Sequence, residues 1–245
     1  IADLLFEINT DLKYDESYNF KEFLMSNTNN ELKKISCNIY CVDKLEQSRL
    51  DNISNLPMIT SHEDKLYYRY EFLKSPHGEI YAYTIFYKNK LNNIDIYIKK
   101  DYKDIKDTID IFKLLMLDKL FSLNNIILLH SSYIKYKNNA ILFSAPSGTG
   151  KSTQANLWNK YENAEIINGD KTAIQKVNGI WYAYGLPYAG SSDIFKNIST
   201  PISAIVVLRK GSKNKVEKLT LKEAFKHIYS ETIINIWDEQ FVNMV

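Results

Sequence analysis

Alternation of hydrophobic and polar residues predicts β-strands in the first half of the chain. Three runs show this pattern, at residues 65–73, 79–88 and 94–99. In the second run, both sets of alternating positions are apolar or aromatic, as in a strand that packs on two faces. The short segment 90–93 predicts a turn, so the second and third runs are expected to form an antiparallel hairpin. Residues 104–122 carry large apolar side chains at intervals of three and four, which predicts an amphipathic helix.

From residue 126 the pattern changes to short apolar strands that alternate with helices. Strands are predicted at residues 126–129, 140–144, 164–168, 179–184 and 203–209, and helices at residues 152–161 and 221–229. Such a strand–loop–helix–strand order is typical of a nucleotide-binding α/β domain. We therefore expect two regions. Residues 1–125 would form an α+β region that contributes to substrate recognition, and residues 126–245 an α/β domain.

The amino-acid composition and net charge argue against several classes of function. Lys and Arg number 31 and Asp and Glu 29, for a net charge of +2. A protein that binds nucleic acid through its phosphates is usually more basic, so we expect no nucleic-acid partner. No apolar run approaches the roughly 18 residues of a membrane helix, and we expect no membrane contact and no signal peptide. Cys37 and Cys41 lack a nearby His, which favours two reduced thiols in a cytoplasmic protein over zinc ligands; a regulatory disulfide is the alternative.

A phosphate-binding loop is the most specific motif in the sequence. Residues 144–153 read Ser-Ala-Pro-Ser-Gly-Thr-Gly-Lys-Ser-Thr. The P-loop pattern is Gly, four residues, then Gly-Lys-Ser/Thr; Gly150, Lys151 and Ser152 fit, and Ala145 replaces the first glycine. Small residues let the backbone N–H groups turn around a phosphate at a helix N-terminus. The alternative, an accidental turn before a helix, is disfavoured because a strand precedes the loop and a helix follows it.

The P-loop predicts ATP and Mg²⁺ as cofactors. Lys151 would carry a positive charge to the β- and γ-phosphates, and the hydroxyl of Ser152 would ligate Mg²⁺. The nucleotide-binding residues are expected to be Ser147, Gly148, Thr149, Gly150, Lys151, Ser152 and Thr153.

Two further polar residues follow predicted strands. Asp170 comes after the strand at 164–168, where it would coordinate Mg²⁺, act as a general base, or do both. Its alternative role is that of a turn residue after Asn168-Gly169. His130 ends the strand at 126–129, and a single His in such a place is either catalytic or structural.

Four segments carry a family resemblance: Leu-His-Ser-Ser-Tyr-Ile at 129–134, Ala-Ile-Leu-Phe at 140–143, Ser-Gly-Thr-Gly-Lys-Ser at 147–152 and Asn-Gly-Asp-Lys at 168–171. They resemble the HPr kinase/phosphorylase-like P-loop family, whose fold is related to phosphoenolpyruvate carboxykinase. The resemblance implies a P-loop sheet of that type over roughly residues 126–228. It also implies that His130 is the active-site His and that Asp170 is the second acid of an Asp-Asp pair. Gly169 replaces the first acid, so Asp170 must serve both metal and proton, or catalysis is impaired.

Residues 185–192, 196–198 and 201–208 are similar to a subgroup of this family associated with ribosomal peptide modification. The corresponding loop of that subgroup reads Gly-x-Pro-Trp-x-Gly, and Tyr188 stands in for the Trp. The resemblance implies an ATP-dependent kinase for a Ser or Thr hydroxyl of a protein or a ribosomally made precursor peptide. The loop at 185–192 would lie near the acceptor, its alternative being an ordinary surface turn. Members of the subgroup continue past Val245, so a cut C-terminus is expected.

Several alternatives stay open. The chain could be a nucleotide-binding regulatory or scaffold protein whose catalysis has lapsed, or a small-molecule phosphotransferase of carboxykinase type. Residues 209–226 hold a run of basic residues against Glu217 and Glu223. That run is either a solvated face or a docking surface for an acidic peptide. The sequence does not distinguish a monomer from a homo-oligomer.

Overall fold

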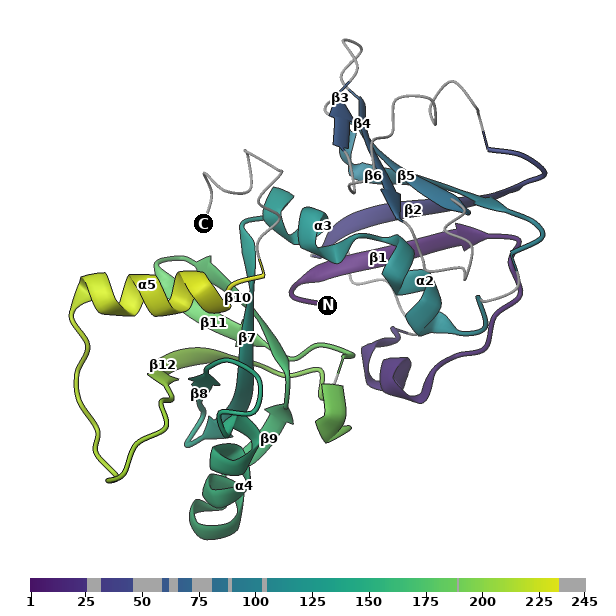
Figure 1. The fold of residues 1–245 in the computed structure, drawn as a ribbon. Coiled ribbons are helices and arrows are strands. Elements are labelled where there is room, and N and C mark those ends of the chain that lie inside the picture. The colour runs from purple at the N-terminus through teal and green to yellow at the C-terminus, as the bar shows by residue number, and fades with distance from the viewer. Residues whose placement is uncertain are drawn as a thin grey trace. The chain divides into compact units, whose positions relative to one another are not determined.

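The computed structural model describes residues 1–25, 32–45, 59–61, 66–71, 81–87, 90–102, 105–188 and 190–233 (Figure 1). These residues form two compact units. One consists of the described residues between Asp3 and Leu120, and the other of those from Phe121 onward, together with Ile1 and Ala2. The boundary therefore falls five residues before the one expected at 125/126. The architecture is mixed α/β, as expected.

The N-terminal unit is built on one sheet with the strand order β1-β2-β6-β5-β4-β3. Its strands are β1 (Leu4–Thr10), β2 (Lys33–Val42), β3 (Ile59–Ser61), β4 (Leu66–Glu71), β5 (Ala82–Tyr87) and β6 (Lys90–Lys99), and its helical segments are η1 (Tyr18–Phe23), α2 (Thr108–Leu114) and the first part of α3 (Leu117–Leu123). β1, β2 and β6 run parallel to one another, and the other neighbours are antiparallel. Along β6, Ile94, Ile96 and Ile98 are buried and alternate with less buried residues, which accounts for the strand pattern of the sequence.

The structure corrects two details of this region. The hairpin of β5 and β6 is confirmed, but residues 90–93 belong to β6 and are not its turn; residue 88 lies outside the described residues. The helix predicted at 104–122 is split into α2 and α3, because Met116 adopts a left-handed φ of 50°. Its start also moves to Thr108, where the carboxylate of Asp107 accepts hydrogen bonds from the backbone N–H groups of Ile109 and Asp110. Residue 104 lies outside the described residues.

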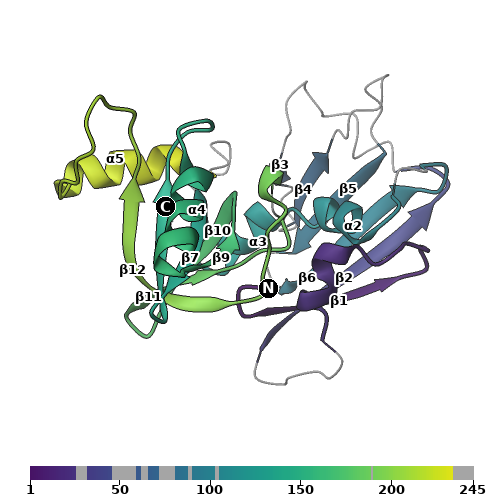
Figure 2. The ribbon, with the colours of Figure 1, turned by 90° about the horizontal axis from the view of Figure 1, so that it is seen from below.

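The C-terminal unit contains a second sheet, with the order β10-β11-β12-β8-β7-β9. Its elements are β7 (Ile126–Tyr136), β8 (Asn139–Ser144), α4 (Lys151–Glu162), β9 (Glu165–Asn168), β10 (Lys171–Val177), β11 (Ile180–Tyr184), η2 (Gly190–Ser192), β12 (Ser199–Val207) and α5 (Leu221–Glu231). β10 also pairs with β7, so β7, β8, β12, β11 and β10 form a closed ring of pairings. α4 packs on β7, β8 and β9, whereas α5 packs on β7 and β12 (Figures 1 and 2).

β7 is much longer than the strand predicted at 126–129, because it changes partner along its length. Residues 126–130 pair with β10, and residues 131–136 pair with β8. The β7–β8 hairpin turns at Lys137 and Asn138, both with positive φ, as a two-residue hairpin loop requires. β10 was not predicted; the left-handed Asn178 and Gly179 connect it to β11. His130 is thus the last residue of β7 to pair with β10, at the point where the strand changes partner.

Two buried clusters hold the C-terminal unit together. Leu129, Tyr133, Ala140, Leu142, Ile167, Ile174 and Ala183 form the first, and Ile228 of α5 packs against it. Residues of β7, β8, β9 and α4 form the second, which includes Phe143 and Ala155. α4 and α5 are therefore each fixed to the sheet by apolar contacts. No helix in the described part of the chain is long and apolar enough to span a membrane.

Candidate functional site

The loop between β8 and α4 has the backbone that a phosphate-binding loop needs. Gly148 and Gly150 have φ angles of 73° and 112°, a conformation that residues with a Cβ rarely adopt. Ala145, which replaces the first glycine of the motif, is buried and is not among the described residues with positive φ. An alanine at this position therefore introduces no backbone strain.

Gly150 is the N-cap of α4, and no described side chain caps this end of the helix. The backbone N–H groups of the first turn of a helix have no partner within the helix. Together with the helix dipole, they favour a bound anion. Ser152 and Thr153 lie in this first turn and are exposed, as are Ser147 and Gly148 in the loop.

Lys151, the first residue of α4, folds back over the loop. Its Nζ donates hydrogen bonds to the carbonyl oxygens of Ala145, at 2.8 Å, and Pro146, at 3.4 Å. Burial lowers the pKa of Lys151, and the carboxylates of Glu231 and Asp170 oppose that shift. The lysine that the sequence assigns to phosphate binding is therefore in the electrostatic field of two carboxylates.

His130 lies between those two carboxylates. Its Nδ1 is 3.0 Å from Oε2 of Glu231, and its Nε2 is 3.7 Å from Oδ1 of Asp170. The side chain of Glu231 is 12% exposed, that of His130 26% and that of Asp170 35%. Glu231 and His130 thus make a partly buried hydrogen-bonded pair, and Asp170 is the member most open to a ligand.

Glu231 is the site residue that the sequence did not reveal. The predicted helix ended at 229, whereas α5 continues to Glu231. The next residues attach this end of the helix to β7: Thr232 forms a β-bridge with Leu129, and Ile233 N–H donates to Leu128 O at 2.8 Å. A carboxylate in the last turn of a helix is disfavoured by the helix dipole. An acidic residue at this unfavourable position of the helix is the one signal in the sequence that could have indicated a role for Glu231.

Asn168 fixes the position of Asp170. Its side chain is completely buried, and its Nδ2 donates to the carbonyl oxygens of Leu186 and Tyr188, at 2.9 and 2.7 Å. Its Oδ1 accepts from the N–H groups of Asp170 and Lys171, at 3.0 and 3.2 Å. The side chain of Asn168 thus closes the turn at this point, and the carboxylate of Asp170 faces His130.

The 185–192 loop is packed closely against Asp170. A Cβ on Gly190 would lie 2.8 Å from both Cβ and Cγ of Asp170, and Gly190 has a φ of 55°. A Cβ on Gly185 would lie 1.9 Å from the carbonyl oxygen of Lys196. Residue 189 lies outside the described residues. At both positions a larger residue would collide with neighbouring atoms, so this segment is packed against the domain and is not an ordinary surface turn.

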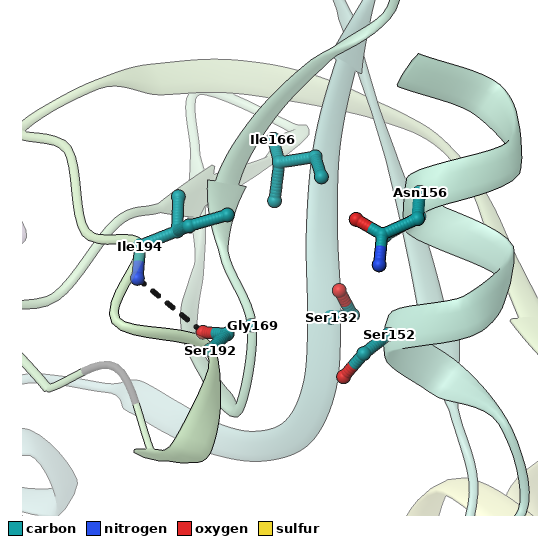
Figure 3. Close-up of a pocket in the computed structure, with 8 residues that line it drawn as sticks. Ser132, Ser152, Asn156, Ile166, Gly169, Ser192 and Ile194 are labelled. Carbon is teal, nitrogen blue, oxygen red and sulfur yellow. Dashed lines mark hydrogen bonds between the residues drawn. The ribbon is translucent and has the colours of Figure 1, made fainter. Parts of the chain in front are cut away.

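Two pockets flank the phosphate loop. The first, of about 300 Å³, lies between α4 and β9 and contains Ser152 and Gly169 in its wall (Figure 3). Figure 3 shows Ser132 and Ser152 close together on its helix side, and Ser192, which accepts a hydrogen bond from Ile194 N–H, on the other. The second pocket, of about 330 Å³, has the P-loop on one side and the end of β12 and α5 on the other. It is lined by Ala145, Pro146, Thr149, Val207, Leu208, Arg209, Lys210, His227, Ser230 and Glu231.

The donors predicted for Mg²⁺, Ser152 and Asp170, are hard oxygen ligands of the kind that this ion prefers. In the described part of the chain, no group of three or more His, Cys, Asp or Glu side chains could hold a metal ion alone. Mg²⁺ that is bound with a nucleotide needs only one or two protein oxygens, since phosphates and water supply the rest. Ser152 and Asp170 are therefore of the right chemical type for a Mg²⁺ ion that would arrive with a nucleotide.

No protein-family model matches the chain, and neither does any curated protein.

Proposed function

We propose that the protein is an ATP-dependent kinase that transfers the γ-phosphoryl group to a Ser or Thr hydroxyl of a protein or ribosomally made precursor peptide. One observation carries the proposal: the phosphate loop shares a pocket with Glu231, and Glu231 and Asp170 are the two carboxylates on either side of His130. A lysine at a helix N-terminus binds phosphate, and an adjacent His–carboxylate pair suits proton transfer from an attacking hydroxyl.

The resemblance to the HPr kinase/phosphorylase-like family supports the same function, and so the P-loop sheet of HPr kinase and phosphoenolpyruvate carboxykinase type is part of the proposal. Free Cys37 and Cys41 agree with a cytoplasmic protein. Lys151 and the loop N–H groups would hold the phosphates of ATP. Ser152 and Asp170 would hold Mg²⁺, which neutralises phosphate charge when bound.

The oxygen of the attacking hydroxyl would bond to the γ-phosphorus while the bond to the bridging oxygen breaks and ADP leaves. The hydroxyl loses its proton to Asp170, the more exposed carboxylate. The proton can pass on to Nε2 of His130 once the 3.7 Å between that nitrogen and Oδ1 of Asp170 shortens to hydrogen-bond distance in the substrate complex. Glu231 accepts a hydrogen bond from Nδ1–H of His130, which fixes the ring orientation and stabilises the imidazolium that forms. In this arrangement Glu231 is a positioning residue. With Asp170 it gives the site two carboxylates, although Gly169 replaces the first acid of the family's Asp-Asp pair.

The function is tested by incubating the full chain with ATP, Mg²⁺ and a library of Ser- and Thr-containing peptides. A gain of about 80 Da on a peptide, one phosphoryl group, is expected by mass spectrometry. Lys151→Ala should abolish it, and Lys160→Ala, an exposed lysine on the same helix, should not.

The same experiment separates the alternatives. ATP binding without transfer to any peptide would favour the regulatory or scaffold function. Phosphorylation of a small acid instead of a peptide would favour the carboxykinase-type reaction. Absence of ATP binding in the folded protein would overturn the assignment of the phosphate loop itself.

A further inference from the structure

α5 presents an exposed apolar stripe. Leu221, Phe225 and Tyr229 are spaced four residues apart and so lie on one side of the helix. Leu221 is 91% exposed and Phe225 63%, and the rings of Phe225 and Tyr229 stack with centroids 5.7 Å apart. The neighbouring side of the helix faces the domain, where Ile228 packs on the first core cluster and Glu231 meets His130. The stripe therefore contributes nothing to the described core of this unit.

Lysines border the stripe and continue into the segment before it. Lys222 and Lys226 follow Leu221 and Phe225 directly on α5, and both are exposed. The two acids of this run are already engaged: Glu217 pairs with Lys215 at 2.7 Å, and Glu223 closes the capping box with Thr220. Among the described residues no carboxylate pairs with the remaining lysines, which are Lys210, Lys213, Lys218, Lys222 and Lys226. The surface is thus both apolar and positively charged.

The basic run that precedes the stripe reaches the site. Arg209 and Lys210, at the start of the basic run, line the second pocket, and so does His227 of α5. The other wall of that pocket is the phosphate loop, and Glu231 lies in it as well. α5 has 11 residues, which is a length of roughly 16 Å. A peptide bound along the stripe would therefore need only a few extended residues to reach His130.

We propose that the α5 stripe, bordered by Lys222 and Lys226, docks an acidic segment of the peptide substrate. The inference rests on the proposed kinase function and names the chemistry of its substrate: Asp or Glu side chains for the lysines, and two or three large apolar residues for Leu221, Phe225 and Tyr229. Such anchors at helical spacing are the usual means of binding along an apolar stripe.

Charge and position favour a peptide over other occupants. A second copy of the chain packed stripe to stripe would bring lysines against lysines, which is unfavourable. An anionic membrane would satisfy the lysines. It would not explain why the same basic run lines a pocket beside the phosphate loop.

The test measures binding of one probe by fluorescence anisotropy. The probe is a labelled peptide of about 16 residues in which Glu pairs alternate with Leu and Phe at helical spacing. The full chain should bind it, and more weakly as salt increases. The double variant Lys222→Glu/Lys226→Glu, and separately Phe225→Ser, should each weaken binding by at least about tenfold. The matched controls Lys160→Glu and Tyr161→Ser change an exposed lysine and an exposed aromatic on α4, and should bind as the unmodified chain does.

ATP affinity is measured on the same variants and should not change, because the altered side chains lie outside the phosphate loop. If the α5 variants bind ATP normally but lose the peptide, the docking surface is supported independently of the nucleotide site. The inference is overturned if the full chain does not bind the probe, or if the α5 variants bind it as tightly as the α4 controls. It is equally overturned if the α5 variants lose binding to phosphatidylglycerol vesicles or dissociate a dimer while their peptide binding is kept.

Discussion

The carboxylate of Glu231, the last residue of α5, lies 3.0 Å from Nδ1 of His130, although 101 residues separate them in the chain. The β-bridge between Thr232 and Leu129 holds the two segments at this distance. Because Nδ1 faces Glu231, the other ring nitrogen is directed to Asp170. The pair therefore determines how His130 can act on the carboxylate proposed as the base.

Glu231→Gln tests this pair. Glutamine keeps the size of the side chain but removes the charge that stabilises the imidazolium, so we expect kcat for peptide phosphorylation to fall by about 10²-fold. KM for ATP should change far less than kcat, because Glu231 acts on Lys151 only through its charge and has no described hydrogen bond to the phosphate loop. Steady-state kinetics with varied ATP give KM, and the rate at saturating ATP gives kcat.

A double-mutant cycle shows whether Glu231 acts through His130. If it does, His130→Ala/Glu231→Gln should cost about as much as His130→Ala alone. Glu217→Gln, an exposed glutamate of the basic run, serves as the control. Additive losses would show that the two residues act separately. Loss of ATP binding in His130→Ala would instead place His130 in the nucleotide pocket or the core.

Asp170→Asn keeps the shape of the side chain and removes its charge. Phosphoryl transfer should fall at least about 10²-fold, the usual scale for a positioned base, while ATP still binds. The main-chain position should be unchanged, since Asn168 holds the N–H of residue 170. Quench-flow with mass-spectrometric detection measures transfer, and Glu162→Gln on α4 is the control. If Asp170→Asn keeps wild-type turnover, Asp170 is only a turn residue and not the base.

Lys151→Ala should lower ATP affinity at least about tenfold, because it removes the charge for the β- and γ-phosphates. The fold should be retained, since Nζ bonds only to carbonyl oxygens of its own loop among the described contacts. Calorimetry with ATP and Mg²⁺ gives the affinity, and Lys160→Ala controls for loss of a lysine from α4. Equal affinities in the two variants would contradict the nucleotide site.

Local patterns predicted much of the C-terminal unit. The loop at 145–150 lies between a strand and a helix, and helix α5 begins at the predicted residue, because a glycine-containing loop and a capping box are each encoded within a few neighbouring residues. The mixed α/β class and the β5–β6 hairpin follow from hydrophobic alternation in the same way.

Contacts between distant segments were not predictable. The change of partner along β7, the ring closure through β10 and the approach of Glu231 to His130 all depend on how the sheet closes. The sequence pattern indicates Asn168 only as part of a turn. Its four hydrogen bonds include two to a loop about 20 residues further along the chain, which no local pattern encodes.

Asn168→Leu is expected to destabilise the C-terminal unit strongly. The substitution leaves two carbonyl oxygens and two N–H groups without their partner, around a side chain that is itself completely buried. The free energy of unfolding should fall by about 3 kcal/mol. Urea denaturation measures it, and Asn159→Ala, which removes one partly buried hydrogen bond, should cost far less. Similar losses for both variants would mean that the Asn168 bonds are not important for stability.

The start of α5 contains a pH-sensitive contact between Thr220 and Glu223. The hydroxyl and the backbone N–H of Thr220 donate to Oε2 of Glu223, at 2.7 and 3.0 Å, and these bonds lower the pKa of Glu223. A carboxyl whose pKa is lower in the folded chain stabilises the fold above its unfolded pKa, about 4.3 for Glu, and this contribution is lost as the pH falls through the folded pKa. Thr220→Ala removes the hydroxyl bond, so the pKa of Glu223 should rise toward its usual value. NMR titration of the Glu223 carboxyl measures the change.

The same substitution should loosen the first turn of α5, because the hydroxyl of Thr220 also accepts from the N–H of Glu223, at 3.3 Å. Faster amide exchange is therefore expected at the N-terminal end of the helix, and not at its C-terminal end, which is tied to β7 through Ile233. Ser212→Ala, an exposed hydroxyl in the preceding segment, should change neither the titration nor the exchange. An unchanged Glu223 pKa in Thr220→Ala would show that the capping box does not hold this carboxylate in solution. The first turn of α5, which carries Leu221 and Lys222, would then not be held in helical form by this contact, and the docking surface would lose its N-terminal end.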